Sequence, residues 1–473
     1  MPILSSRRAA VAGFGSARPA NAQYVVAPLI FGMPNASLNR PLHSLIESDR
    51  VHRDVYLSDA IFALEEERLF GRAWVYVAHA SQVPHAGDYV TLELAGQPVI
   101  LVRDAGDVLR VFFNRCAHKG SMIATERAGN AGRAFRCPYH SWTYRLDGSL
   151  LAVPDPRGYD GTQMRACEAG RGLTPLASAQ YRGFVFTRLA PTGPSFESHC
   201  GAMFHAIDAL VDRSPAGEVE VAGPPLRNVI ACNWKVYLEN VNDALHANVT
   251  HESASLAAER VWSNAPTGST KPMAIEILMP FGSDNEFLKK MGGQVFEHGH
   301  SIFGTNRSIH SAYSSLPDYE AAMEKAYGAE RARKILSWVP QNSIVYPSVS
   351  FKSAPQTIRV IRPLAAERTL VEIWAFRPKD APDAFLERTL LYNRLVFSPM
   401  SIVAHDDIHV FETIHRGLRT SGNPWVSLHR EQTAGEFDTP NKVVSGTNEI
   451  LIRNQFHAWR QYMEADDPVA ARP

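Results

Sequence analysis

Short runs of alternating hydrophobic and polar residues recur between about residue 88 and residue 190. The stretch DYVTLELAGQPVILVRDAGDVLRVFFN (88–114) holds three such runs, separated by the segments AGQP and DAGD. This pattern predicts a β-meander, because a two-residue period marks half-buried strands and Gly, Pro and Asp mark turns. The runs TYRLDGSLLAV (143–153) and RGFVFTRL (182–189) extend the β character.

Helical patterns flank this β-rich region on both sides. Before it, SDAIFALEEERLFGRAW predicts a helix with Ser58 as its N-cap and Asp59 in its first turn. A linker-like stretch, APTGPSFES, follows it, and beyond about residue 200 helices and strands are mixed. We expect a long hairpin at 357–378 and late helical segments with a break near Ser398-Pro399. The predicted fold class is α+β, with an all-β domain inserted near the start.

Changes in period and composition predict four parts. Residues 1–40 are predicted to be a disordered tail, and residues 41–80 a helical lead-in that packs on the larger domain. Paired arginines in the tail faintly resemble an export signal, but Gly and Pro interrupt the apolar core that such a signal needs. The all-β domain is expected at 81–192 and the larger, mixed domain at 193–473.

Charge and composition exclude several functions. Lys+Arg and Asp+Glu both number 48 in the 473 residues, so no bulk positive charge is present to bind nucleic acid. No apolar run reaches 18 residues, so no membrane span is predicted. The five cysteines are too sparse for a disulfide framework, which predicts a reducing, cytoplasmic location.

Two loops each hold one cysteine and one histidine at metal-ligand spacing. CAHKG contains Cys116 and His118, and CPYHSW contains Cys137 and His140. Two sulfurs and two nitrogens suit tetrahedral zinc, but zinc fingers usually group cysteines together and histidines together. A [2Fe–2S] cluster with two cysteines on one iron and two histidines on the other uses the mixed arrangement. Four unrelated loop residues are the alternative without a metal.

A second group of candidate ligands lies in NWKVYLENVNDALHANVTH, which carries Asp243, His246 and His251. Asp243 and His246 are three residues apart, which predicts that they share one helical face. His251 is off that face in a regular helix. Both histidines can therefore reach one metal only if the helix ends or distorts at about Val249-Thr250, where two β-branched residues occur.

A carboxylate from elsewhere in the chain is needed to complete this second site. Two histidines plus one carboxylate form the facial triad of non-haem Fe(II) oxygenases, which leaves positions open for dioxygen. The late helical segment HDDIHVFETIHRGL offers Asp406 and Asp407. From the residues alone both are candidates, and a solvated acidic helix face is the alternative.

These motifs together resemble a known family. CAHKG and CPYHSWTYRLDGSL are similar to the C-x-H-[RK]-G and C-P-Y-H-x-W-x-Y-x-x-D-G motifs of Rieske domains. E-N-x-x-D-x-x-H-x4-H, followed much later by D-x4-E, resembles the catalytic domain of Rieske ring-hydroxylating oxygenase large (alpha) subunits. The likeness extends from about residue 45 to residue 460, and Leu245 departs from it where the family usually has tyrosine.

The resemblance implies the fold and the site residues. It implies an all-β Rieske domain and a larger α+β catalytic domain with a central antiparallel sheet of the helix-grip, START-like type. The implied roles are cluster ligation by Cys116, His118, Cys137 and His140, with Trp142 and Tyr144 packed beside the cluster, Fe(2+) ligation by His246, His251 and Asp407, and contact with both sites by Asp243. Asp407 is preferred to Asp406 because Glu412 follows it by five residues, as in the family.

The resemblance also implies the reaction and the partners. The chain would be the terminal oxygenase of a multicomponent system that uses O2 and electrons from NAD(P)H, delivered by a separate reductase with or without a ferredoxin. The leading reaction is cis-dihydroxylation of an aromatic compound, with an aromatic acid as one candidate substrate. Ring monohydroxylation or oxidative demethylation is the alternative, and a non-catalytic Rieske electron-transfer or binding protein is a remote one. The assembly would be a homotrimer, or α3β3 with a small subunit, in which His140 of one subunit meets Asp243 of the next.

Two further groups of residues are interpreted from the sequence. Arg307 and Lys352 are candidates to pair with a substrate carboxylate, although most such residues are surface charges. The other cysteines have no histidine at ligand spacing and are interpreted as ordinary thiols, namely Cys167, Cys200 and Cys232.

Overall fold

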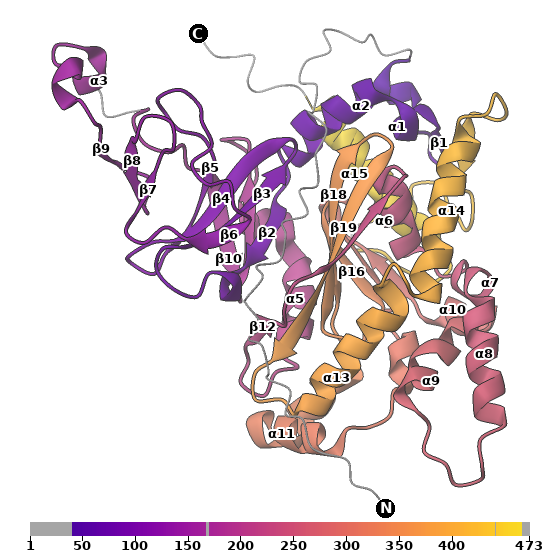
Figure 1. Ribbon diagram of the computed structural model, residues 1–473. Coiled ribbons are helices and arrows are strands. Elements are labelled where there is room, and N and C mark those ends of the chain that lie inside the picture. The colour runs from indigo at the N-terminus through magenta and orange to yellow at the C-terminus, as the bar shows by residue number, and fades with distance from the viewer. Residues whose placement is uncertain (1–39, 167–169, 440, 466–473) are drawn as a thin grey trace, which may run out of the picture. The chain divides into compact units, whose positions relative to one another are not determined.

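The computed structural model describes residues 40–166, 170–439 and 441–465 (Figure 1). The predicted tail, apart from Arg40, and Cys167 lie outside the described residues. Cys200 and Cys232 are free and buried, as ordinary thiols are. In the part of the chain that the structure describes, each helix is too short or too polar to cross a membrane.

The lead-in begins with a 3-10 turn, a short strand and two helices, namely η1 (Leu42–Ser44), β1 (Arg50–His52), α1 (Asp54–Leu57) and α2 (Asp59–Leu64). The predicted N-cap is confirmed, because the side chain of Ser58 accepts a hydrogen bond from the backbone N–H of Ile61 at 3.3 Å. The helix continues as the π-helical segment η2 (Glu65–Phe70). The strand β1 pairs with β20 (Trp425–Ser427).

The predicted β-meander is confirmed as the antiparallel strands β3 (Asp88–Leu94), β4 (Gln97–Arg103) and β5 (Leu109–Phe113). The turn between β3 and β4 places Ala95 and Gly96 at φ 47° and 65°. Two positive φ angles in a two-residue loop match the right-handed twist of the flanking strands. The fourth strand of this sheet, β6 (Ala128–Asn130), pairs with β3.

Two three-stranded antiparallel sheets complete the β-rich region. The first contains β7 (Ala134–Arg136), β8 (Thr143–Arg145) and β9 (Leu150–Ala152). The second contains β2 (Val75–His79), β10 (Ala177–Tyr181) and β11 (Phe184–Arg188). The strands predicted at 143–153 and 182–189 are therefore present.

The larger domain is built on an antiparallel sheet with nine strands among the described residues. In spatial order these are β12 (Val219–Val221), β19 (Arg368–Pro378), β18 (Thr357–Ala365), β17 (Val349–Lys352), β16 (Asn342–Val345), β15 (Ser301–Phe303), β14 (Gly293–Val295) and β21 (Val443–Val444), with β13 (Leu226–Ile230) also paired to β19. The predicted long hairpin is β18 and β19, drawn in orange in Figure 1. Every residue of β16 and β17 is buried, because elements cover both faces of these strands.

Helices contact this sheet, and several of them flank or carry functional side chains of the larger domain. The helices used below are α6 (Trp234–Asn242), α7 (Ala247–Thr250), α8 (Glu252–Ser263), α13 (Asp383–Tyr392), α14 (Ile402–Leu418) and α15 (Ile450–Glu464). The remaining helices are α3 (Gln163–Ala166), α4 (Phe196–Cys200), α5 (Phe204–Val211), α9 (Met273–Leu278), α10 (Asn285–Lys290), α11 (Pro317–Tyr327) and α12 (Ala329–Ser337). The predicted break near Ser398 is confirmed, since α13 passes into the π-helical segment η9 (Asn393–Phe397) and α14 starts at Ile402.

A buried carboxylate fastens the lead-in to the larger domain. Glu65 Oε1 accepts from Lys235 Nζ at 2.5 Å and from Trp459 Nε1 at 2.6 Å, and Oε2 accepts from Trp234 Nε1 at 2.8 Å. All four residues are buried. A charge out of water is tolerated when it is paired and hydrogen-bonded, as Glu65 is here. Removing one partner of such a pair costs about 3–5 kcal/mol.

Candidate active site with two metal centres

The two Cys/His loops share one backbone pattern. In each loop the cysteine N–H donates to the carbonyl five residues on at 2.8 Å, and the cysteine carbonyl accepts from the N–H four residues on at 3.0 Å. The cysteines are Cys116, after β5, and Cys137, between β7 and β8. The residues four further on, Gly120 and Ser141, both have positive φ, at 79° and 57°. Two matching loops thus present two matching Cys/His pairs.

The sulfur side of this site is buried and rich in hydrogen-bond donors. Cys116 and Cys137 belong to one buried cluster with Tyr144. The hydroxyl of Tyr144 accepts from Ala117 N at 3.1 Å and lies 3.1 Å from Cys116 Sγ, so it can donate its own proton to the sulfur when Cys116 is a thiolate. Burial opposes ionisation of Cys137, but backbone hydrogen bonds at Tyr139 and His140 lower the pKa of Cys137 below its usual value. Such surroundings suit thiolate ligands.

The histidine side lies next to the sulfurs. The His118 ring stacks on Trp142 with centroids 4.9 Å apart, and its centroid is 4.7 Å from that of His140. Nδ1 of His118 is buried and has no hydrogen-bond partner among the described residues. A free, buried ring nitrogen beside two buried thiols fits a [2Fe–2S] cluster held by two cysteines and two histidines. His140 is exposed.

The second site begins where α6 ends. The prediction that Asp243 and His246 share a helical face was wrong, because α6 ends at Asn242 and Asp243 is extended (φ −101°, ψ 141°). Instead, Asp243 Oδ2 accepts from the backbone N–H of His246 at 2.8 Å and lies 3.0 Å from its ring Nδ1. Burial opposes the charge of Asp243, but His246 and Arg430 hold the pKa of Asp243 below its usual value. The aspartate thereby orients the His246 ring, leaving Nε2 free.

The helix break that His251 requires is present. The helix α7 ends at Thr250, and α8 begins at Glu252, with His251 between them at φ −105° and ψ 19°. The His251 side chain is 1% exposed and packs edge-on against Phe281, with ring centroids 5.3 Å apart. The helix therefore ends at Thr250, within the segment Val249-Thr250 that the sequence suggested.

The structure brings His246, His251 and Asp407 together. One ligand atom from each residue lies within 4.8 Å of the other two. Asp407 Oδ1 is 3.4 Å from His251 Nε2 and 4.0 Å from His246 Nε2, and it accepts from Asn240 Nδ2 at 3.2 Å. Asp406 lies on the other side of the His251 ring, with Oδ2 3.5 Å from Nδ1. Two imidazoles and one carboxylate converging in this way fit one iron ion. Asp406 lies beside Nδ1 of His251, but Asp406 Oδ2 and His251 Nδ1 are both buried without a hydrogen-bond partner among the described residues.

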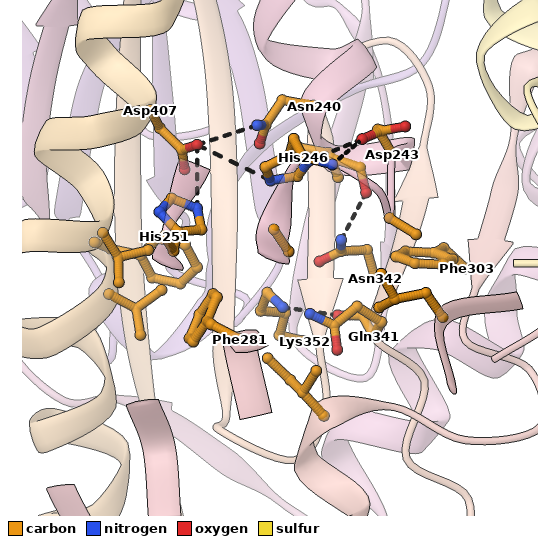
Figure 2. A pocket seen from close by; sticks show the side chains of 18 of the residues that line it. Asn240, Asp243, His246, His251, Phe281, Phe303, Gln341, Asn342, Lys352 and Asp407 are labelled. Carbon is orange, nitrogen blue, oxygen red and sulfur yellow. Dashed lines mark hydrogen bonds and ion pairs between the residues drawn. The ribbon is translucent and has the colours of Figure 1, made fainter. Parts of the chain in front are cut away.

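A pocket opens beside these three residues (Figure 2). Its apolar lining residues are Val241, Ala244, Ala247, Phe281, Leu288, Met291, Phe303, Ile309, Val396, Phe397 and Val403. Its other lining residues are Asn240, Asp243, Gln341, Asn342, Lys352, Arg359, Tyr392 and the two histidines with Asp407. An apolar cavity with a few convergent polar groups is typical of a small-molecule site.

Several of these residues were not found from the sequence. Arg359 lies in β18, where it interrupts a hydrophobic run, and that interruption was the available signal. No pattern marked Arg430, whose Nη2 lies 2.9 Å from Asp243 Oδ1. Of the two cations suggested for a substrate carboxylate, Lys352 lines the pocket, but Arg307 is exposed and stacks on Phe287.

Comparison with known proteins gives the family. Residues 73–166 match the Rieske [2Fe-2S] domain, and residues 208–465 match the ring hydroxylating alpha subunit catalytic domain. The 2-halobenzoate 1,2-dioxygenase large subunit of Burkholderia cepacia is 28% identical over 85% of this chain and 86% of that protein. The N,N-dimethyl phenylurea N-demethylase subunit alpha of Sphingobium sp. (strain YBL2) is 27% identical over 87% and 90%.

A solved structure agrees with these matches. Naphthalene 1,2-dioxygenase from Rhodococcus sp., bound to indole, is 26% identical, with a TM-score of 0.71 over 90% of this chain and 97% of that chain. The resemblance found in the sequence is thus confirmed, as is the fold of a β-rich Rieske part and a larger part with helices and an antiparallel sheet. Because the catalytic-domain model matches more than half of the 473 residues, this protein belongs to the Rieske ring-hydroxylating dioxygenase alpha subunits, which use a [2Fe–2S] cluster and non-haem iron.

Proposed function

We propose that this chain is the terminal oxygenase that cis-dihydroxylates an aromatic compound, with electrons from NAD(P)H delivered by a separate reductase, with or without a ferredoxin. The supporting observation is the convergence of His246, His251 and Asp407 on the wall of a largely apolar pocket. Aromatic acids are candidate substrates, since the relative from Burkholderia cepacia is named for a halobenzoate.

We assign the metal ligands to this chain's residues. Cys116, His118, Cys137 and His140 would hold the cluster, and His246, His251 and Asp407 the mononuclear iron. When bound, the iron supplies open positions for dioxygen and the cluster supplies single electrons. Phe281 and Phe303 would bind the aromatic ring and exclude water from Asp407.

We propose a trimer, alone or with a small subunit, because His140 is exposed and available to a neighbouring subunit. In that assembly the Nε2–H of one subunit's His140 would donate to Asp243 of the next. We retain 81–192 and 193–473 as the proposed domain boundaries, with 41–80 packed on the catalytic domain.

The test is turnover of an aromatic panel by the metal-loaded protein with a compatible reductase. Isotope-labelled dioxygen should place both oxygen atoms in one cis-diol product. One labelled atom in a phenol would instead show monohydroxylation. Formaldehyde from N,N-dimethyl phenylurea would show demethylation, the alternative that the Sphingobium relative favours. If the protein with both metals loaded forms no product from any compound, the result would favour the electron-transfer or binding role over oxygenation.

A further inference from the structure

Two buried cations form part of the pocket wall. Lys352, at the end of β17, is 3% exposed, and Arg359, in β18, is 5% exposed. Both line the pocket that contains the His246, His251 and Asp407 triad. Neither makes an ion pair with any acidic side chain in the described ranges. Burial of a charged group without a counter-charge is unfavourable, so an anion from outside the chain would stabilise the charged forms of both side chains.

The partners of both cations are neutral and leave donors unused. Lys352 Nζ donates to Gln341 O at 2.9 Å, and its remaining N–H bonds have no protein acceptor among the described residues. Arg359 Nη2 donates to Asn342 Oδ1 at 2.6 Å and to Ser350 Oγ at 3.3 Å. Arg359 Nε is buried and has no partner among the described residues. Unused donors on two neighbouring cations match the acceptor oxygens of an oxyanion.

Other buried cations show why position matters. Lys235, the second buried lysine in the described part of the chain, pairs with Glu65 at 2.5 Å. Arg188 is buried without an acid, but its guanidinium donates to backbone carbonyls, including Pro194 O at 2.6 Å, away from this pocket. Lys352 and Arg359 differ from Lys235 because they have no acidic partner. They differ from Arg188 because they line a cavity. In that cavity, burial and the charge of Arg359 lower the pKa of Lys352 well below its usual value, as expected where a counter-ion is missing.

The position of Lys352 and Arg359 relative to the triad defines the orientation in which an anionic aromatic ligand would bind. Figure 2 shows Lys352 and Gln341 on the opposite side of the pocket from Asp407 and His246, with Phe281 and Phe303 among the residues around the space between them. We propose that Lys352 and Arg359 bind an anionic substituent, such as a carboxylate, of the aromatic substrate and so direct its ring toward the triad. This inference rests on the function proposed above and selects anionic aromatic compounds among its candidate substrates.

The binding test compares matched anionic and neutral ligands on the metal-loaded protein without oxygen. Benzoate and benzamide have nearly equal size, as do 2-naphthoate and 2-naphthamide. At least one of the two carboxylates should bind about 10- to 100-fold more tightly than its amide, because hydrogen bonds to charged groups exceed neutral ones by about that factor. Equal binding within both pairs, or no binding of either carboxylate, would overturn the inference without any substitution.

Substitutions test whether Lys352 and Arg359 cause the preference for the carboxylate. Lys352→Met and Arg359→Met should each weaken binding of the carboxylate about 10- to 100-fold and change binding of its amide less than about threefold. The matched control is Arg307→Met, an exposed arginine outside the pocket, which should change neither. Iron content and the visible spectrum show whether each variant remains folded. If a methionine variant does not fold, Lys352→Arg, which keeps the charge, should retain the carboxylate preference.

Turnover separates this inference from the proposed function. A protein that hydroxylates naphthalene or toluene but shows no carboxylate preference overturns the anion site alone. A metal-loaded protein that oxygenates nothing overturns the oxygenase function, whatever its preference in binding.

Discussion

Arg430 and His246 hold opposite oxygens of the same carboxylate. Arg430 Nη2 lies 2.9 Å from Asp243 Oδ1, whereas the ring Nδ1 and backbone N–H of His246 face Oδ2. Arg430 is itself 3.4 Å from Glu449 Oε1. A carboxylate has about four lone-pair positions, so Oδ1 retains room for another donor beside Arg430. Asp243 can thus stay fixed in place while Oδ1 accepts a hydrogen bond from a further donor, such as His140 of the neighbouring subunit in the proposed trimer.

Asp243→Asn should leave both metals bound but abolish product. The amide keeps the size of the side chain, yet it removes the charge that pairs with Arg430 and that would attract His140 of a neighbouring subunit in the proposed trimer. The cluster should still be reduced by a chemical donor. In a single turnover with pre-reduced protein, substrate and oxygen, re-oxidation of the cluster should slow by orders of magnitude.

The control for this experiment is Asp383→Asn, which breaks an exposed pair with Arg377 and should retain full activity. Rapid re-oxidation and a normal product yield in Asp243→Asn would exclude the bridge. A protein that stays active as a monomer at low concentration would exclude the route between subunits.

Asp407→Ala and Asp406→Ala should have different effects on binding of the mononuclear iron. Asp407 Oδ1 lies near Nε2 of both histidines, so its loss should remove the mononuclear iron and all product, while the visible Rieske spectrum remains. Asp406 reaches only Nδ1 of His251, at 3.5 Å, so its loss should weaken iron binding about 10- to 100-fold. Iron analysis and titration measure both effects, and full iron binding by Asp407→Ala would contradict the assignment.

Tyr144→Phe should lower the reduction potential of the Rieske cluster without removing it. When Cys116 is a thiolate ligand, the hydroxyl of Tyr144 donates to its Sγ, and this hydrogen bond is stronger when the cluster carries the additional electron. A difference of about 1–2 kcal/mol between the two states corresponds to about 40–90 mV for one electron. Redox titration measures the shift. Tyr159→Phe, which keeps the ring packed on Trp142, is the control and should leave the potential unchanged.

Glu239 should make the larger domain less stable as pH rises. Burial raises the pKa of Glu239 to about 8, although Tyr56 and Lys235 act in the opposite direction. Between the unfolded value of 4.5 and about 8, the folded state holds a proton that the unfolded chain has released. Stability therefore falls with rising pH, by at most about 1.4 kcal/mol per unit, and levels off above the folded pKa.

Glu239→Gln tests this pH dependence of stability, because an amide at position 239 does not titrate. Its thermal midpoint should exceed that of the parent protein by an amount that grows between pH 5 and pH 8. Glu218→Gln is the control, because the pairing with Lys379 lowers the pKa of Glu218 instead. A constant difference across this pH range for Glu239→Gln would contradict the prediction.

Local patterns were enough to predict much of the fold. The meander, the Ser58 cap and the hairpin of β18 and β19 follow from period and turn residues, which act over a few positions. The Cys/His loops were equally visible, because both ligands of each loop lie within four residues. The resemblance to a family then supplied the catalytic sheet, which periodicity alone did not define.

Relationships between distant segments could not be predicted from the residues alone. Asp406 and Asp407 are neighbours on α14 and point about 100° apart, so choosing between them requires the rotation of that helix relative to α7. The end of α6 at Asn242 was also missed, because Asp243 stabilises a turn through its own side chain. Arg430 reaches Asp243 across 187 residues of sequence, a separation that no local pattern reports.

The carboxylate of Glu65 has a consequence for the order in which the chain can fold. Its donors lie 169, 170 and 394 residues later in the sequence, so Trp459 is synthesised long after Glu65 leaves the ribosome. The catalytic core therefore cannot close fully around this charge until α15 has been made. The sheets formed by β3 to β9 need only residues 88–152, and they can form while the rest of the chain is still being translated.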